Sequence, residues 1–241
     1  ASFTGAVSAT ALSVGATVVN FSSTGSGGTI TNAVAFTNTG TLTLGQALGT
    51  QTYTGGLTTT GAGGVVTLNG TIASSNTALT LGAITLGSNT TLNTNATTAA
   101  GAITLGAVTG AGFNLTLQTA NAVAAGITGT STSGVGTLTI QNMGGTASFS
   151  GAVNASAISV LNTAANVSMT AASGTITGAS SFANSGTLTL GQSGGTLNYN
   201  GGLSTNTVGG VVTLNGTITT SNTAITLGAI TLGANTTLNT N

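Results

Sequence analysis

The chain repeats itself over a long period. Residues 1–95 align without a gap with residues 147–241, at an offset of 146 residues, and about two-thirds of the aligned positions are identical. The phrase NTGTLTLGQ that begins at Asn38 returns as NSGTLTLGQ at Asn184, and Tyr53 returns as Tyr199. Self-similarity on this scale is typical of repeat architectures, in which each unit contacts mainly its neighbours. We therefore interpret residues 1–146 as one complete long repeat and residues 147–241 as part of a second.

A shorter period lies inside the long one. Pairs of residues separated by one position recur at spacings of 24, 24, 25 and 23 residues, namely Leu42/Leu44, Val66/Leu68, Thr90/Leu92, Leu115/Leu117 and Leu138/Ile140. Six units of this size fill the long repeat. We therefore expect six coils in residues 1–146 and a continuation of the same solenoid through residues 147–241.

The local pattern within each unit favours β-strands. Thr alternates with Leu or Val in segments such as GTLTLGQ and GVVTLNG, and Gly or Asn ends each run. Alternation with a period of two, β-branched residues and frequent Gly oppose a helix and indicate short half-buried strands with tight turns. Such strands are stable when coils stack and pair with one another. We predict an all-β fold, a right-handed parallel β-helix (β-solenoid) of about ten coils, with ~24 residues and three short strands per coil.

Stacked coils place equivalent residues in columns along the rod. We predict one inward column with Thr43, Thr67, Thr91, Thr116 and Thr139 outside it, and a column of amides at the corner that follows, where amides stacked in register bond along the axis. The inward column is Leu44, Leu68, Leu92, Leu117, Ile140, Leu190, Leu214 and Leu238. The amide column is Asn69, Asn93, Gln118, Gln141, Asn215 and Asn239.

The composition excludes most chemistry. The chain contains no Lys, Arg, Asp, Glu, His, Cys, Pro or Trp. Catalysis by Ser or Thr needs an adjacent base, zinc sites need His or Cys, and affinity for phosphate backbones comes from Lys and Arg. We therefore expect no enzyme activity, no cofactor, no metal site and no nucleic-acid partner. No apolar run approaches the length of a membrane helix, so we expect no insertion of this segment into a membrane.

Stacking also gives a reason for the missing charge. In-register side chains meet their copies at about 4.8 Å, where two like charges repel by about 0.9 kcal/mol even in water, and the cost recurs at each coil. Absence of charge makes a rod insensitive to pH and salt and permits close packing between rods.

The phrases TLTLG, VTLNGTI and AITLGAVTG, which recur through the whole chain, resemble the β-strand repeats of filamentous-haemagglutinin-like and autotransporter-type bacterial surface proteins. This resemblance implies a right-handed β-helical fold, export through the outer membrane, and an extracellular or cell-surface role in adhesion, aggregation or biofilm matrix. Those relatives carry charged residues, which this chain lacks.

Three functions remain open on the sequence. The first is a structural subunit of an extracellular fibre, sheath or biofilm-matrix filament, whose partner is the same chain joined end to end or laterally. The second is the passive stalk of a large adhesin, and the third is an ice-binding solenoid with rows of outward Thr. Surface glycans are a further candidate partner, because Tyr53 and Tyr199 are expected either to form an exposed sugar-stacking stripe or to pack at a corner.

Overall fold

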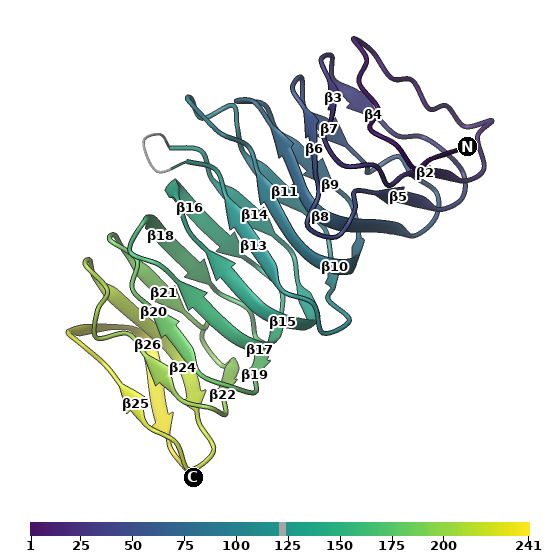
Figure 1. Cartoon of the computed structure of the whole chain (residues 1–241). Helices are drawn as coiled ribbons and strands as arrows, with labels where there is room; N and C mark the ends of the chain where they lie inside the picture. Colours follow the sequence, from purple (N-terminus) through teal and green to yellow (C-terminus); the bar gives the residue numbers. More distant parts are fainter. Residues whose placement is uncertain (121–123) are drawn as a thin grey trace.

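The computed structural model describes residues 1–120 and 124–241. Within these residues the chain forms 26 strands, all in one sheet with parallel pairing, and no helix. The strands wind into a rod with the N-terminal coil at one end and the C-terminal coil at the other (Figure 1). The predicted all-β parallel solenoid is confirmed.

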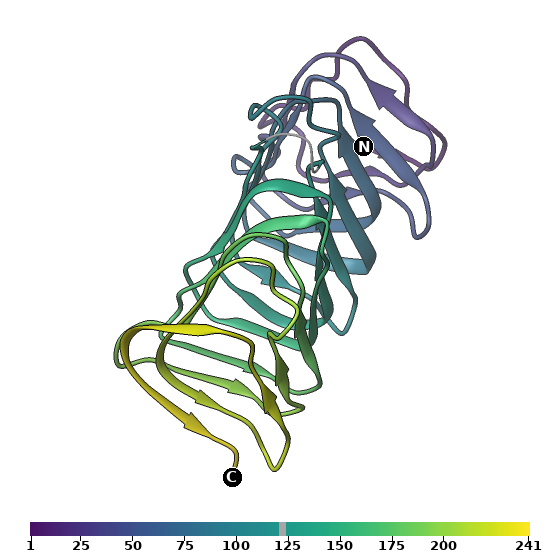
Figure 2. The ribbon, with the colours of Figure 1, turned by 90° about the vertical axis from the view of Figure 1, so that its left-hand side faces the viewer.

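Each turn of the chain has three sides, which Figure 2 shows in the loops seen along the rod. We name the three sides face I, face II and face III in the order in which the chain visits them. Continuous strand pairing from coil to coil assigns every strand to a face. Four long strands bend from face I to face II, and two bend from face III to face I.

Face I contains β1 (Ser2–Phe3), β2 (Phe21–Ser23), β5 (Leu42–Leu44), the first halves of β8 (Val66–Ser74), β10 (Ile84–Asn93), β15 (Thr132–Ile140) and β17 (Val153–Val160), then β12 (Val108–Thr109), β19 (Ser173–Ile176), β22 (Thr196–Tyr199) and the second halves of β24 (Val212–Thr219) and β26 (Ile230–Asn239). Face II contains β3 (Gly28–Ile30), β6 (Thr50–Tyr53), β13 (Leu115–Gln118), β20 (Ser180–Phe182), β23 (Leu203–Ser204), β25 (Ile225–Thr226) and the second halves of β8, β10, β15 and β17. Face III contains β4 (Val34–Ala35), β7 (Leu57–Thr58), β9 (Leu79–Leu81), β11 (Ile103–Leu105), β14 (Ile127–Gly129), β16 (Met143–Phe149), β18 (Ala164–Met169), β21 (Leu188–Leu190) and the first halves of β24 and β26.

The coils are more numerous and less uniform than the sequence spacing predicted. The solenoid has about 11 coils, whereas the spacing of 24 predicted ten. Residues paired on adjacent coils lie from 18 positions apart, as for Thr67 and Thr85, to 25 positions apart, as for Thr91 and Thr116. The prediction of uniform ~24-residue coils was wrong because the corners differ in length.

Two kinds of corner explain the variation. After Leu44 the chain leaves face I through a loop at positions 45–49, and Gly45 has φ +81° with its missing Cβ directed at the Asn69 carbonyl. After Leu68 the strand β8 continues across the corner with no loop, and Gly70 at φ +62° makes the bend. Glycine fits both positions because it adopts positive φ without steric cost. A coil with loops at its corners is therefore longer than one with bent strands.

The long sequence repeat is not a whole number of turns. From Leu42 on face I the chain makes six turns to β19, through β8, β10, β12, β15 and β17, and then passes face II to reach Leu188 on face III. An offset of 146 residues thus corresponds to six and two-thirds turns. The expected six coils in residues 1–146 was an underestimate, and every segment of the second copy lies one face away from its counterpart in the first.

Candidate assembly surfaces

The interior of the rod is filled by aliphatic columns rather than by a binding site. On face III one column runs through eight coils, formed by Leu81, Leu105, Gly129, Phe149, Met169, Leu190, Leu214 and Leu232. On face II another runs through seven, formed by Gln51, Ile72, Leu92, Leu117, Ile140, Val160 and Phe182. All of these side chains except Gly129 and Leu232 are buried. Burial of apolar surface in such columns is the main source of stability in a solenoid.

The predicted inward residues do not form a single column. Leu44 and Leu68 stack on face I, Leu92, Leu117 and Ile140 on face II, Leu190 and Leu214 on face III, and Leu238 returns to face I. All are buried except Leu238, which is 44% exposed in the last coil. Leu68 stacks on Leu86 instead of Leu92, because the short coil between them advances the 24-residue spacing by one extra face.

The predicted amide column is also divided. Gln141 Nε2 donates to Gln118 Oε1 at 3.0 Å, which is the one hydrogen bond between two of its members on adjacent coils among the described residues. Asn93 is in register with Gln118 but donates to Asn95 Oδ1 at 2.9 Å. Asn69 and Asn215 lie at other corners, where each Nδ2 is 3.4 Å from a carbonyl of the preceding coil, and Asn239 pairs with Thr219. The prediction failed here for the same reason, the short coil after Leu68.

Buried asparagines that the sequence reasoning did not select connect the coils instead. Asn184 is fully buried, and its Nδ2 donates to the carbonyls of Ala165, Gly186 and Thr187 at 3.1, 3.0 and 2.9 Å. Asn38, its counterpart in the first copy, makes the equivalent three contacts. Such bonds satisfy carbonyls that the corner would otherwise leave unpaired. The signal in the sequence was the N-x-G-T phrase preserved in both copies.

The two tyrosines are core residues. Tyr53 and Tyr199 are 3% and 2% exposed, so neither can stack on an external sugar. Tyr53 Oη donates to Gln51 Oε1 at 3.1 Å, and the ring of Tyr199 meets Phe182 edge-on with centroids 6.4 Å apart. Burial raises the pKa of both phenols above the ordinary value. The stripe hypothesis was wrong, and the corner-packing alternative is closer to what is found.

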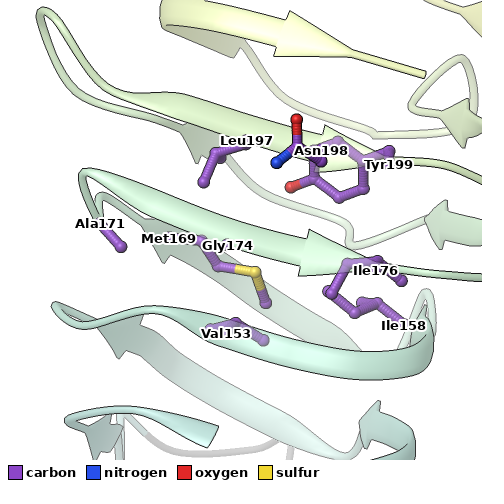
Figure 3. Close-up of a pocket in the computed structure, with 9 residues that line it drawn as sticks. All are labelled: Val153, Ile158, Met169, Ala171, Gly174, Ile176, Leu197, Asn198 and Tyr199. Atoms are coloured by element: carbon purple, nitrogen blue, oxygen red, sulfur yellow. The ribbon is translucent and has the colours of Figure 1, made fainter. Parts of the chain in front are cut away.

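The cavity beside Tyr199 is too small for a ligand. Figure 3 shows the apolar side chains of Val153, Ile158, Met169 and Leu197 around the tyrosine ring. The enclosed space is ≈ 10 Å³. That volume is close to the lower limit for one water molecule, so this cavity is a packing gap.

Outward hydroxyls form an unbroken column on each face. On face II it runs through nine coils, as Thr50, Thr71, Thr91, Thr116, Thr139, Ser159, Ser181, Ser204 and Thr226. On face III it also runs through nine, as Thr58, Thr80, Thr104, Thr128, Ser148, Ser168, Thr189, Thr213 and Thr231. On face I seven follow one another, as Ser2, Ser22, Thr43, Thr67, Thr85, Thr109 and Ser133. Each face therefore presents the same neutral hydrogen-bonding row at the ~4.8 Å strand spacing.

The ends of the rod expose residues that are buried elsewhere. Strands β10 and β26 differ at one residue, Ser88 against Ala234, yet another coil covers β10 and none covers β26. The exposed fraction rises from 2% at Ile84 to 38% at Ile230, from 1% at Leu86 to 59% at Leu232, and from 0% at Leu92 to 44% at Leu238. At the other end Phe3 is 44% exposed, while its counterpart Phe149 is 1% exposed. The same sequence is thus buried wherever a coil lies over it.

No family model, curated protein or solved structure matches the chain. In the ranges 1–120 and 124–241, no helix has the length and apolar character needed to cross a membrane. The fold and its surfaces define the class as an uncharged parallel β-solenoid. Its candidate functional features are the two open ends and the three hydroxyl-bearing faces.

Proposed function

We propose that this chain is a structural segment of an extracellular fibre, sheath or biofilm-matrix filament, in which rods join end to end. The observation that carries the proposal is the difference between β10 and β26. The same apolar surface is covered inside the rod and open at its C-terminal end. A second rod placed on that end would bury it as the next coil buries β10.

Head-to-tail stacking produces an open filament. The N-terminal and C-terminal ends are different surfaces, so a contact between them is heterologous and continues from molecule to molecule. Each end also carries unpaired backbone N–H and C=O groups, which are a ready template for another parallel strand. Both features support growth along the rod axis.

The absence of charge supports the same function. No like charges oppose the approach of two ends, and near-zero net charge promotes association. The extracellular location rests on the resemblance to filamentous-haemagglutinin-like and autotransporter-type proteins, which use β-solenoids outside the cell. A passive adhesin stalk would use the same rod without joining its ends.

Lysine at the open end is expected to stop filament growth. Leu232→Lys/Leu238→Lys replaces two side chains that are 59% and 44% exposed, so the rod should still fold. The charges face an incoming rod across an apolar contact, where burial of an unpaired charge is costly. We expect the native chain to form micrometre-long filaments by negative-stain microscopy and the double variant to remain as short rods.

The matched control is Thr104→Lys/Thr128→Lys, which adds the same charge on face III and leaves both ends unchanged. Filaments of native length are expected from this control. Native protein that stays as dispersed short rods at all concentrations would contradict the fibre and favour the passive stalk. Thermal hysteresis or inhibition of ice recrystallisation by such rods would favour ice binding.

A further inference from the structure

We infer that the three faces are lateral contact surfaces for other copies of the same rod, and that the period of six and two-thirds turns presents equivalent contact patches on different faces. The inference rests on the proposed fibre and extends it from a single filament to a bundle. It commits to one partner, a second copy of this chain.

The hydroxyl columns fit another copy because their spacing matches. A hydroxyl both donates and accepts, so a row of Thr and Ser is complementary to an identical row. The two rows stay in register over many coils only if both have the ~4.8 Å strand spacing. Every face of a second rod has that spacing, as the columns through Thr104 on face III and Thr116 on face II show.

Exposed valines give each patch an apolar centre. Val65 and Val211 occupy the same position in the two long repeats and are 57% and 54% exposed. Val65 directly precedes the face I strand β8, whereas Val211 directly precedes the face III strand β24. Beside Val65 lies a shallow groove of ≈ 400 Å³ lined by Gly63, Gly64, Ala83 and Ala107 among others. A side chain of a neighbouring rod can enter it.

The rotation between repeats explains how one sequence position serves several neighbours. Each successive long repeat displaces its patch by one face, so Val65 and Val211 point toward different neighbours. A period of a whole number of turns would instead place all equivalent patches on one face and favour a flat sheet. No charged side chain on any face opposes this contact.

The test compares two variants that add the same number of lysines. Val65→Lys/Val211→Lys charges faces I and III, whereas Thr104→Lys/Thr128→Lys charges face III alone, and all four positions are exposed. We expect native bundles many rods thick. The Thr104→Lys/Thr128→Lys variant should form layers through its two free faces, and the Val65→Lys/Val211→Lys variant should form only pairs of rods. Salt at 1 M, where the Debye length is about 3 Å, should restore bundle width.

Cryo-electron microscopy cross-sections measure the width, and circular dichroism verifies that each variant folds. Width reports the lateral contact and length reports the end-to-end contact, so failure of this inference is distinguishable from failure of the proposed function. Equal width in the native protein and both variants would overturn the inference. Equal narrowing by both variants would also overturn it, because the effect would then be independent of which faces are charged.

Discussion

Leu92→Ala is expected to lower the free energy of unfolding by about 2–5 kcal/mol, while Leu238→Ala lowers it far less. The two leucines occupy the same position in nearly identical strands, but Leu92 is fully buried between Ile72 and Leu117 and Leu238 is 44% exposed in the last coil. Truncation at Leu92 removes contacts and leaves a cavity, because the coils on both sides cannot collapse into the space. Urea unfolding followed by circular dichroism measures both variants.

The internal duplication makes this comparison unusually well controlled. Local sequence, strand propensity and side-chain chemistry are the same at the two sites, so the difference isolates the covering coil. A second pair, Leu86→Ala and Leu232→Ala, repeats the comparison at 1% and 59% exposure. Equal destabilisation within either pair would show that stacking of the next coil is not what stabilises these positions.

Stability is expected to fall steeply only in strong alkali. No side chain other than tyrosine titrates between pH 2 and 12, and burial raises the pKa of Tyr53 and Tyr199. In the unfolded chain both phenols ionise near pH 10. Above that pH the unfolded state binds fewer protons than the native state, so the free energy of unfolding decreases by about 1.4 kcal/mol per pH unit for each tyrosine.

The stability contribution of the neutral phenols is thus fully present below about pH 10 and is lost as the pH rises toward the pKa of the buried groups. Urea midpoints measured from pH 4 to 12 should be flat to about pH 9 and then decline. In Tyr53→Phe/Tyr199→Phe the decline should disappear. An alkaline decline of equal slope in that double variant would assign the effect to something other than these phenols.

Strand type and coil stacking could be predicted from the sequence because they depend on local patterns. Alternation of Thr with Leu in phrases such as TLTLG determines which side chains face inward, and parallel stacking follows from repetition. Which coils lie face to face depends on corner length, which is a property of two short phrases. After Leu44 the GQALG segment forms a loop, whereas after Leu68 the NG dipeptide lets the strand continue around the corner.

The error had a detectable signal. VTLNGTI alternates on both sides of its Asn-Gly step, so it contains enough strand for two faces, and Gly70 and Gly216 both adopt positive φ. Counting such bent strands as two faces would have given coils shorter than 24 residues and a long repeat that is not a whole number of turns. The amide column depended on the same count. The buried Asn38 and Asn184 escaped notice because burial of a polar side chain depends on tertiary contacts.

Rotation of the repeat also bears on the absence of charge. An offset of six and two-thirds turns moves each surface position to a different face in the next copy, so every face draws its residues from the same set of positions. A charged residue tolerated on one face would therefore appear on the others as well. For a rod that contacts copies of itself on three sides, neutrality at every surface position is the composition that we expect.

Cysteine cross-linking tests the stacking register most directly, because the chain has no cysteine of its own. Disulfides require Cα atoms about 4.4–6.8 Å apart, a range that includes neighbouring strands in register. Oxidation should therefore link the pairs Thr67→Cys/Thr85→Cys and Thr116→Cys/Thr139→Cys, which lie side by side on adjacent coils. It should not link Thr67→Cys/Thr91→Cys, which are 24 positions apart but on different faces. Efficient cross-linking of Thr67→Cys/Thr91→Cys, with none in the first pair, would contradict the stacking on which the proposed assembly depends.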